Sequence, residues 1–265
     1  MTSVPRWERP LPWGRFGLVT RIHHAVHDRI TLVAARPLLL RNMDGQMLDL
    51  RNRRQIMDAL GMAVDELVQD LYSDAAHGPK MVQEPEITSR LCERLEERLD
   101  GQRAGDYVFG VIGLSMPDRG RDSMEKITGA DLLLSFSLDG PEGFNKAIFV
   151  QSKYDRNVNR NELLDACRRM QHHAGSEGTY VWIYAQDGVR VFSSHQIRRM
   201  RGNTFEGLQP RSMVGFTGRI LDCYAGTQNW GIPMGPMRDR RRILVERLRE
   251  VRAQYALDLS VRQRH

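Results

Sequence analysis

Apolar residues recur at helical spacing in two stretches of the chain. In residues 84–101 they stand three or four positions apart, which places them on one face of a helix that ends at a glycine. Residues 51–72 show the same spacing. The pattern predicts two amphipathic helices, with apolar positions at Ile56, Leu60, Val64, Leu67, Leu71, Ile87, Leu91, Leu95 and Leu99.

The pattern then changes to short apolar runs bounded by turn residues, which is typical of buried strands. A helical pattern separates the last run from the others. The order from residue 84 to residue 185 is helix, strand, strand, strand, helix, strand, so we expect an α/β fold with a mixed sheet flanked by helices. The strands are expected at 106–116, 130–138, 146–154 and 179–185, and the second helix at 159–175.

Composition shifts divide the chain into three parts. We expect a core at 81–190, preceded by a partly helical N-terminal extension at 1–80. The C-terminal extension, 191–265, is expected to end in a basic amphipathic helix whose apolar stripe is Leu244, Leu248, Val251 and Tyr255. Such a helix either packs on the core with a solvated arginine face, or grips phosphates or a second subunit.

The charge balance favours a polyanionic partner. The net charge is +6 and the pI is about 9.5. Only four of the 39 basic residues are lysines, so the other 35 are arginines. A GC-rich genome explains such a bias, and a surface that binds phosphate oxygens is compatible with it. Against this background Lys153 stands out, because it has not been replaced by arginine.

Several classes of protein are disfavoured. No apolar run approaches the roughly 20 residues that a membrane helix needs, and the N-terminus lacks the apolar core of a secretion signal. The three cysteines, Cys92, Cys167 and Cys223, are widely spaced and form no metal-binding pair motif. We therefore expect a cytoplasmic protein without a membrane segment.

Polar residues occur where buried strands would prefer none. Asp131 opens the second predicted strand, and Gln151 and Lys153 lie near the end of the third. Because side chains alternate along a strand, Gln151 and Lys153 share one face and Ser152 takes the other. If the two strands pair as an antiparallel hairpin, Asp131 lies beside Gln151 and Lys153.

This grouping suits a metal ion that acts on a phosphate. Mg²⁺ prefers carboxylate and carbonyl oxygens, which Asp131, the Gln151 side chain and the Ser152 carbonyl can provide. A metal there would polarise a phosphate and activate a water. Lys153 would stabilise the charge that develops on the phosphate.

The phrase "TGAD" before an apolar strand, followed by "QSK" at the end of the next, resembles the PD-(D/E)XK or restriction-endonuclease-like nuclease superfamily, in its variant with Gln at the acidic position. The resemblance covers residues 84–185. It implies that Asp131 binds metal, that Gln151 is a metal-side ligand and that Lys153 is the catalytic lysine. It also implies a glutamate from the first core helix; Glu86 fits best, and Glu84 is the alternative.

The resemblance implies a DNA endonuclease that uses Mg²⁺ or Mn²⁺, and a role in bacterial anti-phage defence or restriction. Cleavage of both strands of a duplex implies a homodimer or larger oligomer. The main alternative is a nucleic-acid-binding or scaffold protein that kept the fold and lost the chemistry, because Gln151 supplies one charge fewer than an acid. A purely structural alternative makes Asp131 the cap of a turn and places Gln151 and Lys153 on a solvated edge strand. An RNA-directed nuclease is disfavoured, because no aromatic-rich strand lies near the site.

Overall fold

In the described part of the chain the helices pack on a seven-stranded mixed sheet, with the strand order β1-β2-β7-β3-β4-β5-β6. The computed structural model describes residues 48–77, 84–116, 125–140, 143–155 and 158–264. The strands are β1 (Arg103–Ala104), β2 (Tyr107–Ser115), β3 (Leu132–Leu138), β4 (Phe144–Tyr154), β5 (Thr179–Ala185), β6 (Gly188–Ser193) and β7 (Tyr255–Gln263). The helices are α1 (Leu50–His77), α2 (Glu84–Leu99), α3 (Glu125–Thr128), α4 (Arg160–Ala174), α5 (Ser194–Ile197), α6 (Met213–Leu221), the 3₁₀ turn η1 (Gln228–Trp230) and α7 (Met237–Val251).

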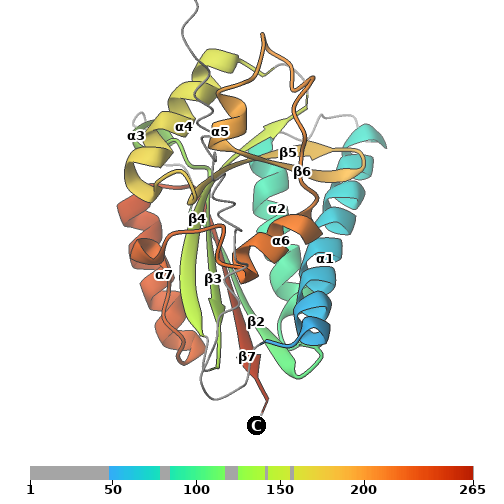
Figure 1. Cartoon of the computed structure of the whole chain (residues 1–265), viewed down its shortest axis with the longest axis vertical. Helices are drawn as coiled ribbons and strands as arrows, with labels where there is room; N and C mark the ends of the chain where they lie inside the picture. Colours follow the sequence, from blue (N-terminus) through green and yellow to red (C-terminus); the bar gives the residue numbers. More distant parts are fainter. Residues whose placement is uncertain (1–47, 78–83, 117–124, 141–142, 156–157, 265) are drawn as a thin grey trace, which may run out of the picture. The chain divides into compact units, whose positions relative to one another are not determined.

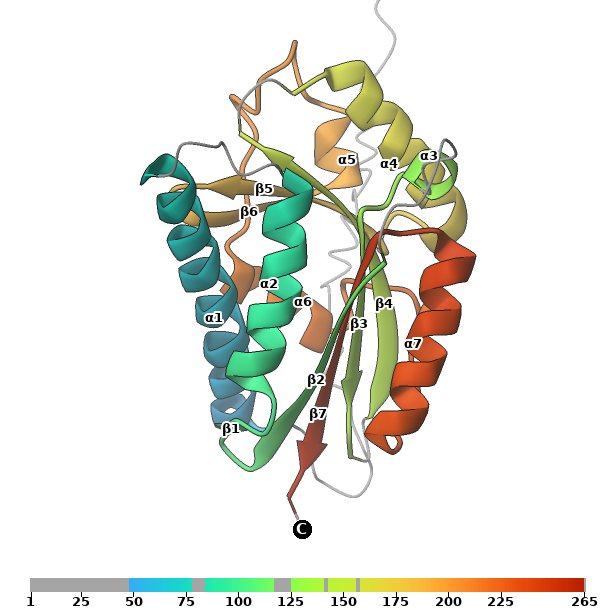
Figure 2. The same ribbon diagram turned by 180° about the vertical axis from the view of Figure 1, so that it is seen from behind.

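Helices cover both faces of the sheet (Figures 1 and 2). Alternate side chains of each long strand point to opposite faces: on β3, Leu132 and Leu134 join the apolar cluster under α1, α2 and α6, whereas Leu133 joins the cluster under α4 and α7. Every apolar position predicted for α1 and α2 is buried. The predicted α/β class, with a mixed sheet flanked by helices, is therefore confirmed.

The predicted order of elements is present between α2 and β5. β3 and β4 form the expected antiparallel hairpin, and β4 pairs in parallel with β5 after the crossover helix α4. Two short elements, β1 and α3, interrupt the order without changing it. The hairpin and the crossover place β4 between β3 and β5 as far as Val150, and the last residues of β4 pair with β5 alone.

The prediction for the C-terminus is wrong beyond Val251. The helix α7 ends there, and Arg252 adopts a left-handed backbone conformation with φ of 55°. The chain then enters β7, which pairs antiparallel with β2 and parallel with β3 in the middle of the sheet (Figure 2). The physical reason lies in the spacing of the apolar residues, because from Tyr255 onward they alternate with polar or small ones, as in a strand. Tyr255 fits the helical stripe only by coincidence of spacing.

The helix α7 itself packs on the sheet through its predicted stripe. Leu244, Leu248 and Val251 are buried. On its solvent face, arginines pair with glutamates of the same helix, such as Arg242 with Glu246 at 3.0 Å. These contacts support a helix packed on the core; phosphate or subunit contacts by its arginines stay a prediction.

Candidate functional site

The hairpin pairing brings Asp131 to the end of β4. Leu132 faces Val150 across the ladder, and the Asp131 amide donates to the Val150 carbonyl at 2.9 Å. The preceding Gly129 has φ of +76°, and a Cβ there would lie 2.7 Å from the backbone of Ala166 in α4. Only glycine tolerates both conditions, so the turn before Asp131 depends on it.

The Asp131 carboxylate is almost fully buried, with 4% of the residue exposed. Its Oδ2 accepts a hydrogen bond from the Gln151 side-chain amide, a second from the Ser152 amide at 2.7 Å and a third from the Ser152 hydroxyl at 2.9 Å. All three donors are neutral, so they stabilise the ionised carboxylate without cancelling its charge. Asp131 and Gln151 are therefore in direct contact.

A chain of buried hydroxyls continues from Ser152. The Ser152 Oγ lies 3.1 Å from Thr88 Oγ1 on α2, which lies 2.9 Å from the Tyr184 hydroxyl on β5. Burial raises the pKa of Tyr184, so this phenol stays protonated. Each hydroxyl has one proton. When Ser152 donates to Asp131, its oxygen can accept the Thr88 proton, for which the Glu84 backbone carbonyl, 3.2 Å from Thr88 Oγ1, is a second acceptor; the Tyr184 hydroxyl can then donate to Thr88.

Lys153 is held by the first core helix. Its Nζ lies 2.8 Å from Glu84 Oε1, and both side chains are partly buried. Glu86 instead pairs with Arg90 on the exposed side of α2. The structure therefore brings Glu84, and not the expected Glu86, to Lys153. The reason is helical geometry: Glu84 lies one turn before Thr88, whose side chain faces the sheet.

The next residue on β4, Tyr154, lies at the same end of the sheet. Its ring meets that of Tyr72 edge to face, with centroids 6.0 Å apart. Burial, followed by the nearby Tyr72 and the charges of Glu84 and Glu86, raises the pKa of Tyr154 to about 12. The N-terminal end of α2 therefore concentrates negative charge beside Lys153.

The solvated-edge alternative is contradicted for Gln151 by its burial, although β4 pairs with β3 only as far as Val150 and its last residues pair with β5 alone. Gln151 pairs with Val181, and Lys153 pairs with Ile183, in parallel register on β5. Gln151 is buried with Asp131, and Lys153 is partly buried. A polar pair inside a sheet is costly unless it has partners or a function.

The donor set fits a hard cation in its chemistry. Asp131 supplies a carboxylate, and Gln151 and the Ser152 carbonyl supply neutral oxygens, the ligand types that Mg²⁺ prefers. The second carboxylate nearby, Glu84, pairs with Lys153. Gln151 presents its amide nitrogen to Asp131, so ligation through its oxygen requires the amide to rotate. Among the described residues, no group of three or more His, Cys, Asp or Glu side chains could hold a metal. A cation here would depend on the Asp131 carboxylate supplemented by neutral oxygens.

Comparisons with known proteins do not identify the chain. No family model, curated protein or solved structure matches it. No helix in the described part of the chain combines the length and apolarity needed to cross a membrane.

Proposed function

We propose that this chain is a metal-dependent nuclease that hydrolyses phosphodiester bonds in DNA, built on a PD-(D/E)XK-like core. The observation that carries the proposal is the meeting of Asp131, Gln151 and the Lys153–Glu84 pair at the end of β4. Buried polar groups of this kind, gathered from α2, β3 and β4, are expensive for a purely structural purpose. The order from α2 to β5 agrees with the core that the resemblance implies, with β7 inserted between β2 and β3.

Each side chain has a distinct role in the proposed mechanism. A bound Mg²⁺ would polarise the scissile phosphate and lower the pKa of a water. Asp131 and Gln151 would hold the ion, with the Ser152 carbonyl beside them. Lys153 would place its ammonium against the phosphate as negative charge develops, and Glu84 fixes the direction of that ammonium. The hydroxyls of Ser152, Thr88 and Tyr184 orient the carboxylate.

The biological setting and the assembly are further parts of the proposal. Defence against phage or a restriction role is implied by the resemblance alone, as are a double-stranded substrate and a homodimer or larger oligomer. The excess of arginine is compatible with a nucleic-acid substrate.

Plasmid cleavage tests the function. Supercoiled DNA is incubated with Mg²⁺, Mn²⁺ or EDTA and with the wild type, Asp131→Ala or Lys153→Ala. We expect nicked or linear products with either metal, and none with EDTA or with either variant. Metal-independent cleavage, or full activity in the variants, would contradict the proposal.

The second candidate is a binding protein without catalysis. The observation that favours it is the bond from the Gln151 amide to Asp131, which satisfies the buried carboxylate with no metal. A gel-shift assay separates the two: a scaffold retains DNA in every variant and cleaves in none, including the wild type.

A further inference from the structure

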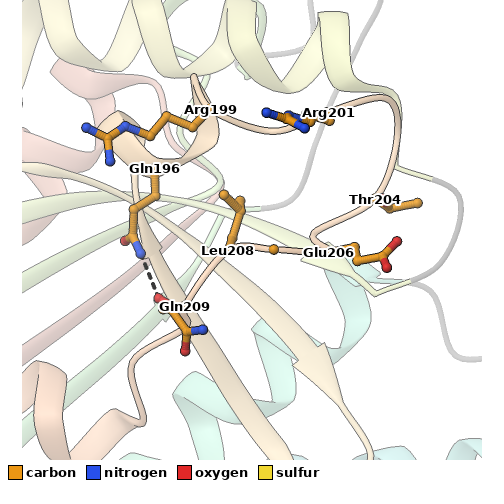
Figure 3. Close-up of a pocket in the computed structure, with 8 residues that line it drawn as sticks. Gln196, Arg199, Arg201, Thr204, Glu206, Leu208 and Gln209 are labelled. Carbon is orange, nitrogen blue, oxygen red and sulfur yellow. Dashed lines mark hydrogen bonds between the residues drawn. The ribbon is translucent and has the colours of Figure 1, made fainter.

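An irregular segment, 198–211, follows α5 and lies close to the candidate site. We call it the 198–211 loop. It lines a depression of about 630 Å³ whose walls include Arg199, Arg201 and Glu206. In Figure 3 the two arginines extend from one arm of the loop, and Thr204 and Glu206 from the other.

This depression continues toward the end of β4. A second depression shares Thr204, Glu206 and Leu208 with the first, and is also lined by Asp155 and Ile183. Ile183 is the register partner of Lys153, and Asp155 follows Lys153 by two residues. The two depressions border the same loop residues, and we call them together the arginine groove: one is lined by Asp155 and Ile183 near Lys153, and the other by Arg199 and Arg201.

The 198–211 loop is fixed at several points although it contains no regular structure over most of its length. Gln196 donates from its side chain to the Gln209 carbonyl at 2.6 Å, a bond drawn in Figure 3. Phe205 stacks on Phe192 with centroids 5.1 Å apart. The Arg160 Nε donates to the Met200 carbonyl at 2.9 Å. The arginines are thus carried by a backbone that is already in place before a ligand arrives.

Arg199 and Arg201 differ from the ion-paired arginines of the surface helices. On α1, α2 and α7, arginines form ion pairs with nearby acids, as Arg98 does with Glu66 and Arg247 with Glu250. Arg199 and Arg201 are exposed, and within the described ranges neither forms an ion pair with an acidic side chain. Glu206 and Asp155 also line the groove, so the positive charge is concentrated at its outer end.

We infer that the arginine groove holds the backbone of the nucleic acid next to the scissile phosphate, with Arg199 and Arg201 each contacting a phosphate. The inference rests on the proposed function, because a phosphodiester cleaved beside Lys153 must continue along the surface in both directions. Guanidinium groups that are already exposed bind phosphates without first breaking an ion pair. The acidic residues at the inner end lie nearest the site where the metal is proposed to bind.

DNA binding in EDTA tests the inference without requiring cleavage. A fluorescein-labelled duplex is titrated with the full-length protein, and the dissociation constant is measured by anisotropy between about 50 and 200 mM salt. The test variant is Arg199→Gln/Arg201→Gln. The matched control is Arg54→Gln/Arg98→Gln, which removes the same charge from ion-paired arginines of α1 and α2.

We expect the test variant to bind DNA about tenfold more weakly than the wild type at about 50 mM salt. It should also reduce the magnitude of the slope of log K against log salt by about 1.8, since each lost phosphate contact removes about 0.9. The control should change the slope by less than half as much. Equal effects in both double variants, no effect in the test variant, or no DNA binding by the wild type would overturn the inference. Preference for an acidic polypeptide over DNA would also overturn it.

The two proposals fail in different ways. If the wild type binds DNA through Arg199 and Arg201 but never cleaves it, the groove proposal is supported and the nuclease proposal is contradicted. If the wild type cleaves with metal and the test variant binds and cleaves normally, the nuclease proposal is supported and the groove proposal is contradicted.

Discussion

Two carboxylates are buried in the same sheet, and their partners differ. Asp258 on β7 is 1% exposed and accepts from Arg240 at both oxygens, at 2.8 and 2.6 Å. Arg240 is equally buried, and its remaining donors reach the Pro233 carbonyl and the Ser137 hydroxyl. Asp131, which immediately precedes β3, is bound at Oδ2 by the neutral groups of Gln151 and Ser152.

The difference separates a structural carboxylate from a candidate functional one. A guanidinium that binds both oxygens neutralises Asp258 and fixes α7 against β7. Neutral donors of Gln151 and Ser152 hold Asp131 in one orientation, and in the proposed function its charge attracts the metal ion. The position agrees with this division, because Asp258 lies in the middle of its strand and Asp131 at the end of the sheet where Lys153 and Glu84 meet.

The largest expected effect concerns the stability of the Asp258 pair. Arg240→Met leaves a buried carboxylate without its cation and should lower the free energy of unfolding by about 3–5 kcal/mol. Urea denaturation measures the loss. The double variant Arg240→Met/Asp258→Leu removes both charges and should recover much of it. A single variant within about 1 kcal/mol of the wild type would show that the pair is not structural.

Asp131→Asn should lose little stability but most of the cleavage activity, in contrast to the variant of the Asp258 pair. The side chain keeps its shape, so we expect a stability loss of only about 1–2 kcal/mol. Cleavage of plasmid DNA should fall by at least about a hundredfold, because the charge that attracts the metal is gone. If stability collapses while the folded fraction stays fully active, the comparison between the two carboxylates is wrong.

The secondary structure was predictable wherever one periodicity dominated. The stripes of α1 and α2 and the apolar runs of β3 to β5 follow directly from burial of one face or both. β7 was missed because its place between β2 and β3 depends on pairing with residues more than a hundred positions away. Its own alternation, from Tyr255 to Val261, was the available signal.

The candidate site was predictable in part. The hairpin rule predicts the contact between Asp131 and Gln151, which the structure contains. The choice of Glu86 over Glu84 ignored the helical stripe, which already placed Glu84 in line with Thr88. The sequence does not distinguish Thr88 and Tyr184 as site residues, because a single hydroxyl in an apolar helix or strand is typical of an ordinary core position. Their role depends on which strands and helices become neighbours.

Two glutamates of α2 provide matched variants that test the site, with a smaller expected effect on the cleavage rate. Glu84→Gln removes the ion pair that directs Lys153 and should lower the cleavage rate by about tenfold or more. Glu86→Gln removes the same charge from the same first turn of α2, where Glu86 pairs with Arg90, and should leave the rate nearly unchanged. Initial rates on plasmid DNA measure both. Equal losses would mean that only the total negative charge matters.

The smallest expected effect concerns the hydroxyl chain. Tyr184→Phe should cost about 1 kcal/mol of stability and raise the Mn²⁺ concentration needed for half-maximal cleavage by about tenfold. Tyr180→Phe is the control, because Tyr180 is buried on the same strand and belongs to the same apolar cluster. The control should lose comparable stability without shifting the metal requirement. A shift of the same size in both variants would assign the effect to packing alone.

The most direct test of the central claim compares two lysines of one strand. Wild type, Lys153→Ala and Lys146→Ala are incubated with supercoiled plasmid in Mg²⁺ and in EDTA. Lys146 is buried elsewhere on β4, so its variant controls for loss of a lysine from that strand. The account predicts Mg²⁺-dependent cleavage by the wild type and by the folded Lys146→Ala protein, and none by a folded Lys153→Ala. Cleavage by Lys153→Ala at the wild-type rate would contradict it.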